Sequence, residues 1–119
     1  MNFDQFNEKS KLLINEAQNK AISLNHQQIL PLHLLYSILN DKNDLIFDLF
    51  NEYKIDIHDI KNKILSNLNV LTTVTGKKLN IFFSNELINI LEQSKNIKNE
   101  FKDEFVSPEI LIYSIILLN

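Results

Sequence analysis

The sequence contains no cysteine, one glycine and two prolines, and each of these scarcities excludes something. Without cysteine the chain can form neither a disulfide nor a thiolate metal site. Because glycine and proline are the usual helix breakers, their near absence favours long uninterrupted helices. All twelve basic residues are lysine, so no guanidinium group is present for bidentate contacts. The net charge of −3 gives no electrostatic reason to bind nucleic acid.

Long apolar segments are also missing. No apolar run reaches the roughly 20 residues that span a bilayer, so we expect no membrane contact. The amino-terminal residues 1–4 have neither the basic start nor the apolar stretch of a secretory signal, which predicts a cytoplasmic protein. With 119 residues, 45% of them hydrophobic, the chain fits one globular domain. Residues 115–118 are apolar, and we expect the domain to be the first of a longer protein, because terminal residues are usually solvated.

Two copies of one pattern, 77 positions apart, organise the chain. Each copy reads as a helical stretch, a short polar connection and an apolar helix that begins at proline, where the missing N–H costs nothing. Repeated units of this kind bury each other's apolar faces. The pattern predicts one all-α domain at 1–119, with repeat one at about 3–68, a linker at about 69–83 and repeat two at about 84–118. The matching pairs are Pro31 and Pro108, Leu34 and Leu111, Tyr36 and Tyr113, Ser37 and Ser114, and Ile38 and Ile115.

Polar residues mark where the helices begin. Such residues act as N-caps because their side chains accept a bond from an unpaired N–H of the first turn. Between 69 and 83 the helical period is lost, which indicates an extended linker. Gly76 is expected in a surface turn, since the second glycine and the hydroxyl residue of a phosphate-binding loop are missing. The expected caps are Asn7 with Ser10 as an alternative, Asp44, Asp56, Ser84 or Asn85, and Ser107.

No catalytic or metal-binding constellation is evident. His26 and His33 are seven residues apart, and neither a cysteine nor a histidine one turn away completes a metal set. We expect His33, inside an apolar helix, to be a structural imidazole bonded to a neighbour. The serines lack the glycine setting of a nucleophile elbow. The chain is therefore expected to be a non-enzymatic module with no metal or cofactor of its own.

Three segments together carry a resemblance to a known family. Residues 6–10 read Phe-Asn-Glu-Lys-Ser, residues 29–35 read Ile-Leu-Pro-Leu-His-Leu-Leu, and residues 106–111 read Val-Ser-Pro-Glu-Ile-Leu. In order and spacing they resemble the N-terminal domain of the Clp ATPase chaperones, over about residues 3–118. Residues 103–107 and the opening Asp4 look most like the ClpB disaggregase branch.

The sequence departs from the family pattern at several positions. Asn7 replaces the usual threonine, and both residues can cap a helix. Lys54 stands where a helix-ending glycine is common, which predicts a strained or rearranged turn. Ile110 replaces a histidine that is frequent in protease-linked members. The linker lacks the family's glycine-rich stretch.

The resemblance implies a pseudo-twofold double repeat of about eight helices in two four-helix halves. It also implies that the domain precedes two AAA+ ATPase modules, which bind ATP and magnesium and assemble as a homohexamer. The domain itself would receive unfolded or aggregated polypeptide, or an adaptor protein, before the ring threads the substrate. Isolated, it is expected to be a monomer.

An apolar groove is the site expected from this resemblance. Its walls are predicted at Ile97, Phe101 and Ile110, and its floor at Leu13 and Ile14. Three polar positions beside it match those of the family: Asn7, Asp103 and Glu109. A plainer interpretation remains open, because the four aliphatic residues are at helical spacing and fit a core, and Glu109 fits a helix-dipole partner. Phe101, which lies among polar residues, is the best candidate for exposure.

Three functions remain open at this stage. A substrate-receiving domain of a disaggregase would bind unfolded chains weakly and with little sequence preference. An adaptor-docking domain of a protease-linked Clp ATPase would bind one folded partner tightly. An independent helical scaffold would have no ATPase partner.

Overall fold

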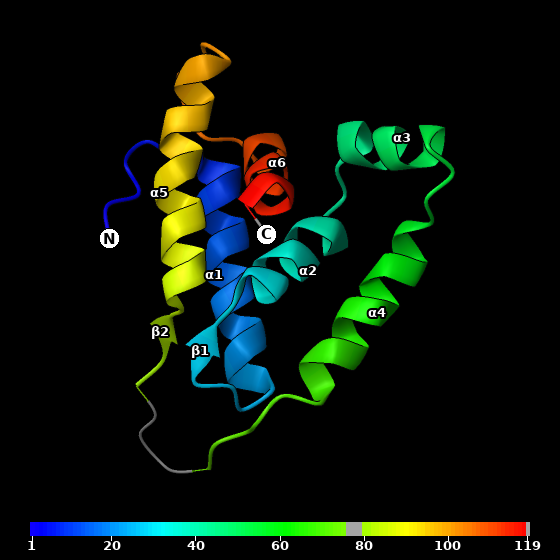
Figure 1. The fold of residues 1–119 in the computed structure, drawn as a ribbon, viewed down its shortest axis with the longest axis vertical. Coiled ribbons are helices and arrows are strands. Elements are labelled where there is room, and N and C mark those ends of the chain that lie inside the picture. Colours follow the sequence, from blue (N-terminus) through cyan, green and yellow to red (C-terminus); the bar gives the residue numbers. More distant parts are fainter. Residues whose placement is uncertain (76–79, 119) are drawn as a thin grey trace.

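The computed structural model describes residues 1–75 and 80–118, and in them the chain forms six helices and two short strands (Figure 1). The mostly helical architecture agrees with the all-α expectation. The expected count of about eight helices in two four-helix halves is not confirmed, since the described part of the second copy holds two helices. The elements are α1 (Glu8–Ser23), β1 (Gln28–Ile29), α2 (Pro31–Asn40), α3 (Asp44–Glu52), α4 (Ile57–Asn69), β2 (Phe82–Phe83), α5 (Asn85–Glu100) and α6 (Pro108–Leu118).

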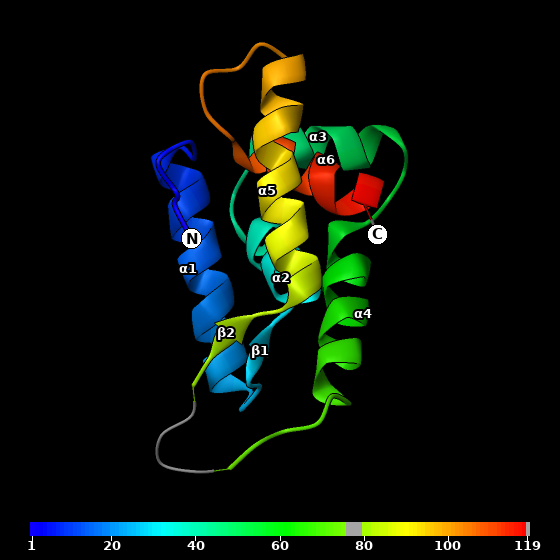
Figure 2. The ribbon, with the colours of Figure 1, turned by 60° about the vertical axis from the view of Figure 1, so that its left-hand side comes forward.

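The two copies meet through their second helices. Helix α1 packs along α2 and α5 packs along α6, and α2 and α6 contact each other. Helix α4 packs against α2, whereas α3 lies at the edge of the molecule, near α6 (Figure 1, Figure 2). Among the described residues, no helix is long and apolar enough to cross a membrane.

Each copy has a backbone segment that pairs with the other copy. Strand β1 of the first copy pairs in parallel with β2, which leads into α5 of the second copy. In the reverse direction, Phe6, which leads into α1, forms a parallel bridge with Val106 of the second copy. The two pairings are equivalent under the 77-residue shift: the N–H of Ser84 donates to the carbonyl of Ile29 at 3.0 Å, and the N–H of Asn7 donates to the carbonyl of Val106 at 3.0 Å. The domain is therefore pseudo-symmetric in its hydrogen bonds as well as in its sequence.

The first helix of each copy ends in the same turn. Asn25 and Lys102 both have φ near 59°, in the left-handed region. The residue after each, His26 or Asp103, donates its N–H to the carbonyl five residues earlier at 2.9 Å. This is the bonding of a Schellman-type helix end, which satisfies a carbonyl that the helix leaves unpaired. Lys54 ends α3 with φ 58°, so the turn keeps its left-handed residue without the expected glycine.

The caps are largely those expected from the sequence. Asn7 caps α1 by accepting from the N–H of Ser10, and Ser84 caps α5 by accepting from Leu87. Helix α4 is capped by Asp56, and the hydroxyl of Ser107 accepts from the N–H of Ile110. For α3 the prediction was wrong by one residue. Asn43 is the cap and Asp44 is the first helical residue, where its charge favours the positive end of the helix.

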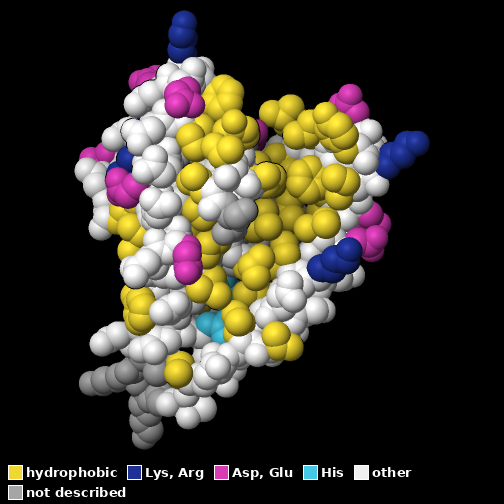
Figure 3. Space-filling view, viewed as in Figure 1, with side chains coloured by type: hydrophobic (Ala, Val, Ile, Leu, Met, Phe, Trp, Pro, Cys, Tyr) yellow, Lys and Arg dark blue, Asp and Glu magenta, His cyan; other side chains and the backbone are white. Residues whose placement is uncertain are grey.

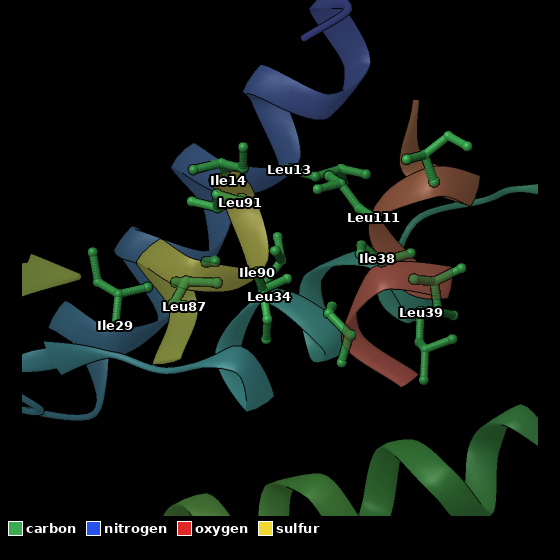
Figure 4. Close-up of a cluster of buried hydrophobic side chains, with 14 of the residues drawn as sticks. Leu13, Ile14, Ile29, Leu34, Ile38, Leu39, Leu87, Ile90, Leu91 and Leu111 are labelled. Carbon is green, nitrogen blue, oxygen red and sulfur yellow. The ribbon is translucent and has the colours of Figure 1, made fainter. Parts of the chain in front are cut away.

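One continuous apolar core joins both copies (Figure 4). It contains the repeat-related leucines Leu34 and Leu111, both fully buried. The hydroxyl of Ser37 is also buried and donates to the carbonyl of Leu13 at 2.7 Å, which locks α2 onto α1. The labelled side chains of Figure 4 come from β1, α1, α2, α5 and α6, so neither copy has a core of its own.

The connection after α4 returns to the first copy. The N–H of Val74 donates to the carbonyl of Asn25 at 2.8 Å. Leu71 and Val74 are half-buried, and the two threonines between them are exposed. The described parts of the predicted linker outside α4, residues 70–75 and 80–83, contain no helix. The turn expected at Gly76 lies outside the described residues.

Candidate functional site

An apolar groove lies between α3 and α6. It has a volume of about 580 Å³. Figure 3 shows apolar side chains gathered over α3 and α6, with a hollow between them. The lining includes two acidic residues and no basic one. The lining residues are Leu45, Ile46, Leu49, Phe50, Phe101, Asp103, Ser107, Glu109, Ile110, Ile112, Tyr113 and Ile116.

The α6 wall of the groove is anchored more firmly in the core than the α3 wall. Ile110 and Ile112 are buried, which fixes the helix against the core. Ile116, on the same helix, remains 63% exposed. Phe101, at the end of α5, stacks edge-on against Tyr113 with ring centroids 5.5 Å apart, and both rings stay about half exposed. This wall therefore presents aromatic and aliphatic surface that is already ordered.

The α3 side is lightly attached. Of its nine residues only Ile46 is buried, and Leu45 and Leu49 are at least half exposed. A single side chain-to-side chain hydrogen bond ties its start to α6: Nδ2 of Asn43 donates to Oε2 of Glu109 at 2.6 Å. The same asparagine caps α3 through its Oδ1. One residue thus both caps α3 and bonds its start to α6.

The structure brings together four of the eight predicted site residues. Phe101, Asp103, Glu109 and Ile110 line the groove. Phe101 is 53% exposed, as expected.

The other four predicted residues lie elsewhere. Leu13, Ile14 and Ile97 are core residues, at most 6% exposed, because their helix faces pack inside the domain. The predicted floor of Leu13 and Ile14 is therefore wrong. Asn7 caps α1 and bonds Val106 at the pairing of the two copies, and it does not line the groove.

Eight lining residues were missed by the sequence analysis, and half of them belong to α3. The eight are Leu45, Ile46, Leu49 and Phe50 of α3, Ile112, Tyr113 and Ile116 of α6, and Ser107, which precedes α6. A signal for α3 was present, since a nine-residue helix with five apolar residues has more apolar surface than one packing face covers. Nothing in the sequence indicates that this surplus faces α6.

Two of the three histidines, His26 and His33, form a buried pair away from the groove. The N–H of Leu30 donates to Nδ1 of His33 at 2.8 Å, and Nε2 of His33 lies 2.9 Å from Nδ1 of His26. Because Nδ1 of His33 accepts, its Nε2 carries the proton and donates to His26. Burial, and after it the electrostatic effects of His26 and Lys20, lower the pKa of His33 from 6.5 to about 4. His33 is therefore a neutral, structural imidazole, and in the described residues no group of three or more metal-binding side chains is found.

Comparison with known proteins identifies the family. Residues 5–117 match the family described as Clp repeat (R) N-terminal domain. This chain belongs to the Clp repeat N-terminal domain family. The resemblance inferred from the three sequence segments is thereby confirmed.

Relatives of this Clp N-terminal domain include full-length chaperones. The chaperone protein ClpB of Rickettsia typhi is 36% identical over 110 residues, which are 92% of this chain and 13% of the relative. ClpB of Pseudomonas putida is 26% identical over 112 residues, 94% of this chain and again 13% of the relative. The chain thus spans about an eighth of the length of these relatives.

Solved structures show the same fold. The crystal structure of the Hsp104 N-terminal domain from Candida albicans matches with a TM-score of 0.84 at 20% identity, covering 94% of this chain and 73% of that one. The N-domain of ClpV from Vibrio cholerae matches with a TM-score of 0.79 at 18% identity, covering 94% and 66%. At these identities the likeness concerns the architecture of the Clp N-terminal domain.

Proposed function

We propose that this domain receives exposed apolar segments of unfolded or aggregated polypeptide for a ClpB-type chaperone, and that it binds them in the groove between α3 and α6. The observation that carries the proposal is the open apolar groove itself. Exposed apolar depressions of this size with a polar rim are typical of interaction sites. The similarity to ClpB chaperones supplies the cellular context.

Weak and sequence-tolerant binding follows from the lining of the groove. Most of its residues are aliphatic or aromatic, and such contacts carry little directional information. Asp103 and Glu109 at the rim disfavour acidic segments, because no basic residue in the lining offsets their charge. In this proposal, ATP and magnesium bind other modules of the same protein, which assemble the hexamer and thread the chain.

An NMR titration of the labelled domain tests the proposal. One sample receives a permanently unfolded protein and a second receives the same protein folded. Shifts confined to the groove, with the unfolded form alone, are expected. A tight response to one folded partner would favour adaptor docking, and no response to either form would leave this domain as a scaffold.

Two substitutions locate the site. Leu49→Ser and Ile116→Ser change side chains that are at least half exposed on opposite walls, so the fold should be retained. Each should weaken binding about fivefold, because it removes about 1 kcal/mol of apolar burial on binding. Ile22→Ser is the matched control, since Ile22 is similarly exposed on α1 and lies outside the groove lining. Equal loss in all three variants would contradict the assignment of the groove.

A further inference from the structure

An extended segment, residues 71–74, packs on a surface of the first copy. The equivalent surface of the second copy is part of the groove. Residues 71–74 run beside the turn after α1, and Leu71 and Val74 line one shallow cavity together with His26 and Leu30. The 77-residue shift places Asp103 where His26 is and Ser107 where Leu30 is. Both of these residues line the groove between α3 and α6.

The backbone acceptor in the first copy has a counterpart in the second. The carbonyl of Asn25 accepts the N–H of Val74 at 2.8 Å. Lys102 occupies the equivalent place, with the same φ of 59° and the same two flanking helix-end hydrogen bonds of 3.0 and 2.9 Å. Identical local bonding holds the two carbonyls in equivalent positions relative to their helices. No donor among the described residues bonds the carbonyl of Lys102.

The side chain of Asp103, which follows this carbonyl, also has no hydrogen-bond partner among the described residues. In the first copy His26 is bonded to His33. In the second copy Ile110 replaces His33, and the carboxylate of Asp103 has no hydrogen bond to the described residues. Asp103 and its neighbour Phe101 both line the groove, with Lys102 between them. The carbonyl of Asn25 and the side chain of His26 are hydrogen-bonded in the first copy, whereas their counterparts at Lys102 and Asp103 have no partner among the described residues.

We propose that the groove binds an extended peptide segment in the manner in which the first copy binds residues 71–74. A backbone N–H of the segment donates to the carbonyl of Lys102, and two apolar side chains three positions apart contact the apolar lining. The proposal rests on the proposed function and names its substrate class: extended chain with the spacing of Leu71 and Val74 and small polar residues between them. Binding through a main-chain N–H explains how one site accepts many sequences, since every residue except proline carries that donor.

The chain itself supplies the probe. A capped hexapeptide with the sequence of residues 70–75, Val-Leu-Thr-Thr-Val-Thr, is titrated into the ¹³C,¹⁵N-labelled domain. We expect binding in the millimolar range, because an untethered segment lacks the effective concentration of the linked one. The carbonyl carbon of Lys102 and the amide of Asp103 should shift with the same affinity as the groove methyl groups. Shifts at Asn25 without shifts at Lys102 would overturn the proposal.

N-methylation isolates the hydrogen bond. Methylating the nitrogen of the second valine, the counterpart of Val74, removes the proposed donor and should weaken binding roughly three- to tenfold. Methylating the nitrogen of the first threonine, the counterpart of Thr72, is the control and should leave the affinity within twofold. Equal effects of the two methyl groups would overturn the proposal.

A parallel titration with an unfolded protein separates the two levels of inference. If the unfolded protein shifts the groove and the hexapeptide leaves Lys102 unchanged, the binding mode is refuted while the proposed function stands. If neither ligand shifts the groove, the proposed function fails and this inference fails with it.

Discussion

Acid should destabilise the domain through His33. Its pKa is lowered from 6.5 to about 4 in the folded protein, so the unfolded chain binds a proton at higher pH than the folded one. Stability is then fully present above pH 6.5 and is lost as the pH falls toward 4. One pKa unit corresponds to about 1.4 kcal/mol, so the complete loss amounts to about 3 kcal/mol, and about 2 kcal/mol of it falls between pH 7 and pH 5.

Urea unfolding at pH 7 and pH 5 measures this loss. The substitution His33→Gln removes the titrating group, and the free energy of unfolding of this variant should depend on pH by about 2 kcal/mol less than that of the unmodified chain. His58→Gln is the matched control, because His58 is exposed and its imidazole has no hydrogen bond to the described residues. Following the ring protons of His33 by NMR gives a direct second readout. The reasoning is refuted if His33→Gln and the unmodified chain lose the same free energy, or if His33 titrates near pH 6.5 in the folded domain.

Substitutions at Asn43, Lys54 and Leu34 test other parts of the structure by urea unfolding and by groove binding. Asn43→Ala should lower the free energy of unfolding by about 1 kcal/mol, since it removes a helix cap, whereas Asn43→Ser keeps a cap but cannot reach Glu109. If the hydrogen bond from Asn43 to Glu109 holds α3 in place beside α6, both variants should change the affinity of the groove for peptide. Only the alanine variant should be clearly destabilised. Lys54→Gly should stabilise the domain by about 1 kcal/mol because of its left-handed φ, and Lys61→Gly, inside α4, should destabilise it by a similar amount. Leu34→Ala should cost about 2–5 kcal/mol, since Leu34 is fully buried, and a loss below 1 kcal/mol would contradict its place in the core.

The elements of the fold were predictable where local signals were strong. Pro31 and Pro108 begin their helices at the expected positions, and Asn7, Asp56 and Ser84 act as caps. These signals depend on residues within one turn of each other, so a single sequence contains them. The pairing of each copy with the other depends on backbone groups about 50 or 100 residues apart, and it leaves no side-chain pattern to recognise.

The site was harder to predict than the fold. Helical spacing alone could not distinguish Leu13 or Ile97, which are buried, from Ile116, which is exposed, because all three lie on strongly apolar helix faces. Which face is covered depends on tertiary packing. The exposure of Phe101 was predicted correctly, because its neighbours in the sequence are polar on both sides.

The parallel bridge between Phe6 and Val106 has a consequence for synthesis of the protein. Val106 accepts from the N–H of Asn7 and from the hydroxyl of Ser10, and it donates to the carbonyl of Gln5, so the start of α1 is completed by a residue 100 positions later. At roughly 5–20 residues per second, a ribosome needs about 5–20 s to make the intervening chain. During that interval the apolar face of α1 lacks its final partners, and the nascent domain is itself an unfolded polypeptide of the kind that we propose it receives.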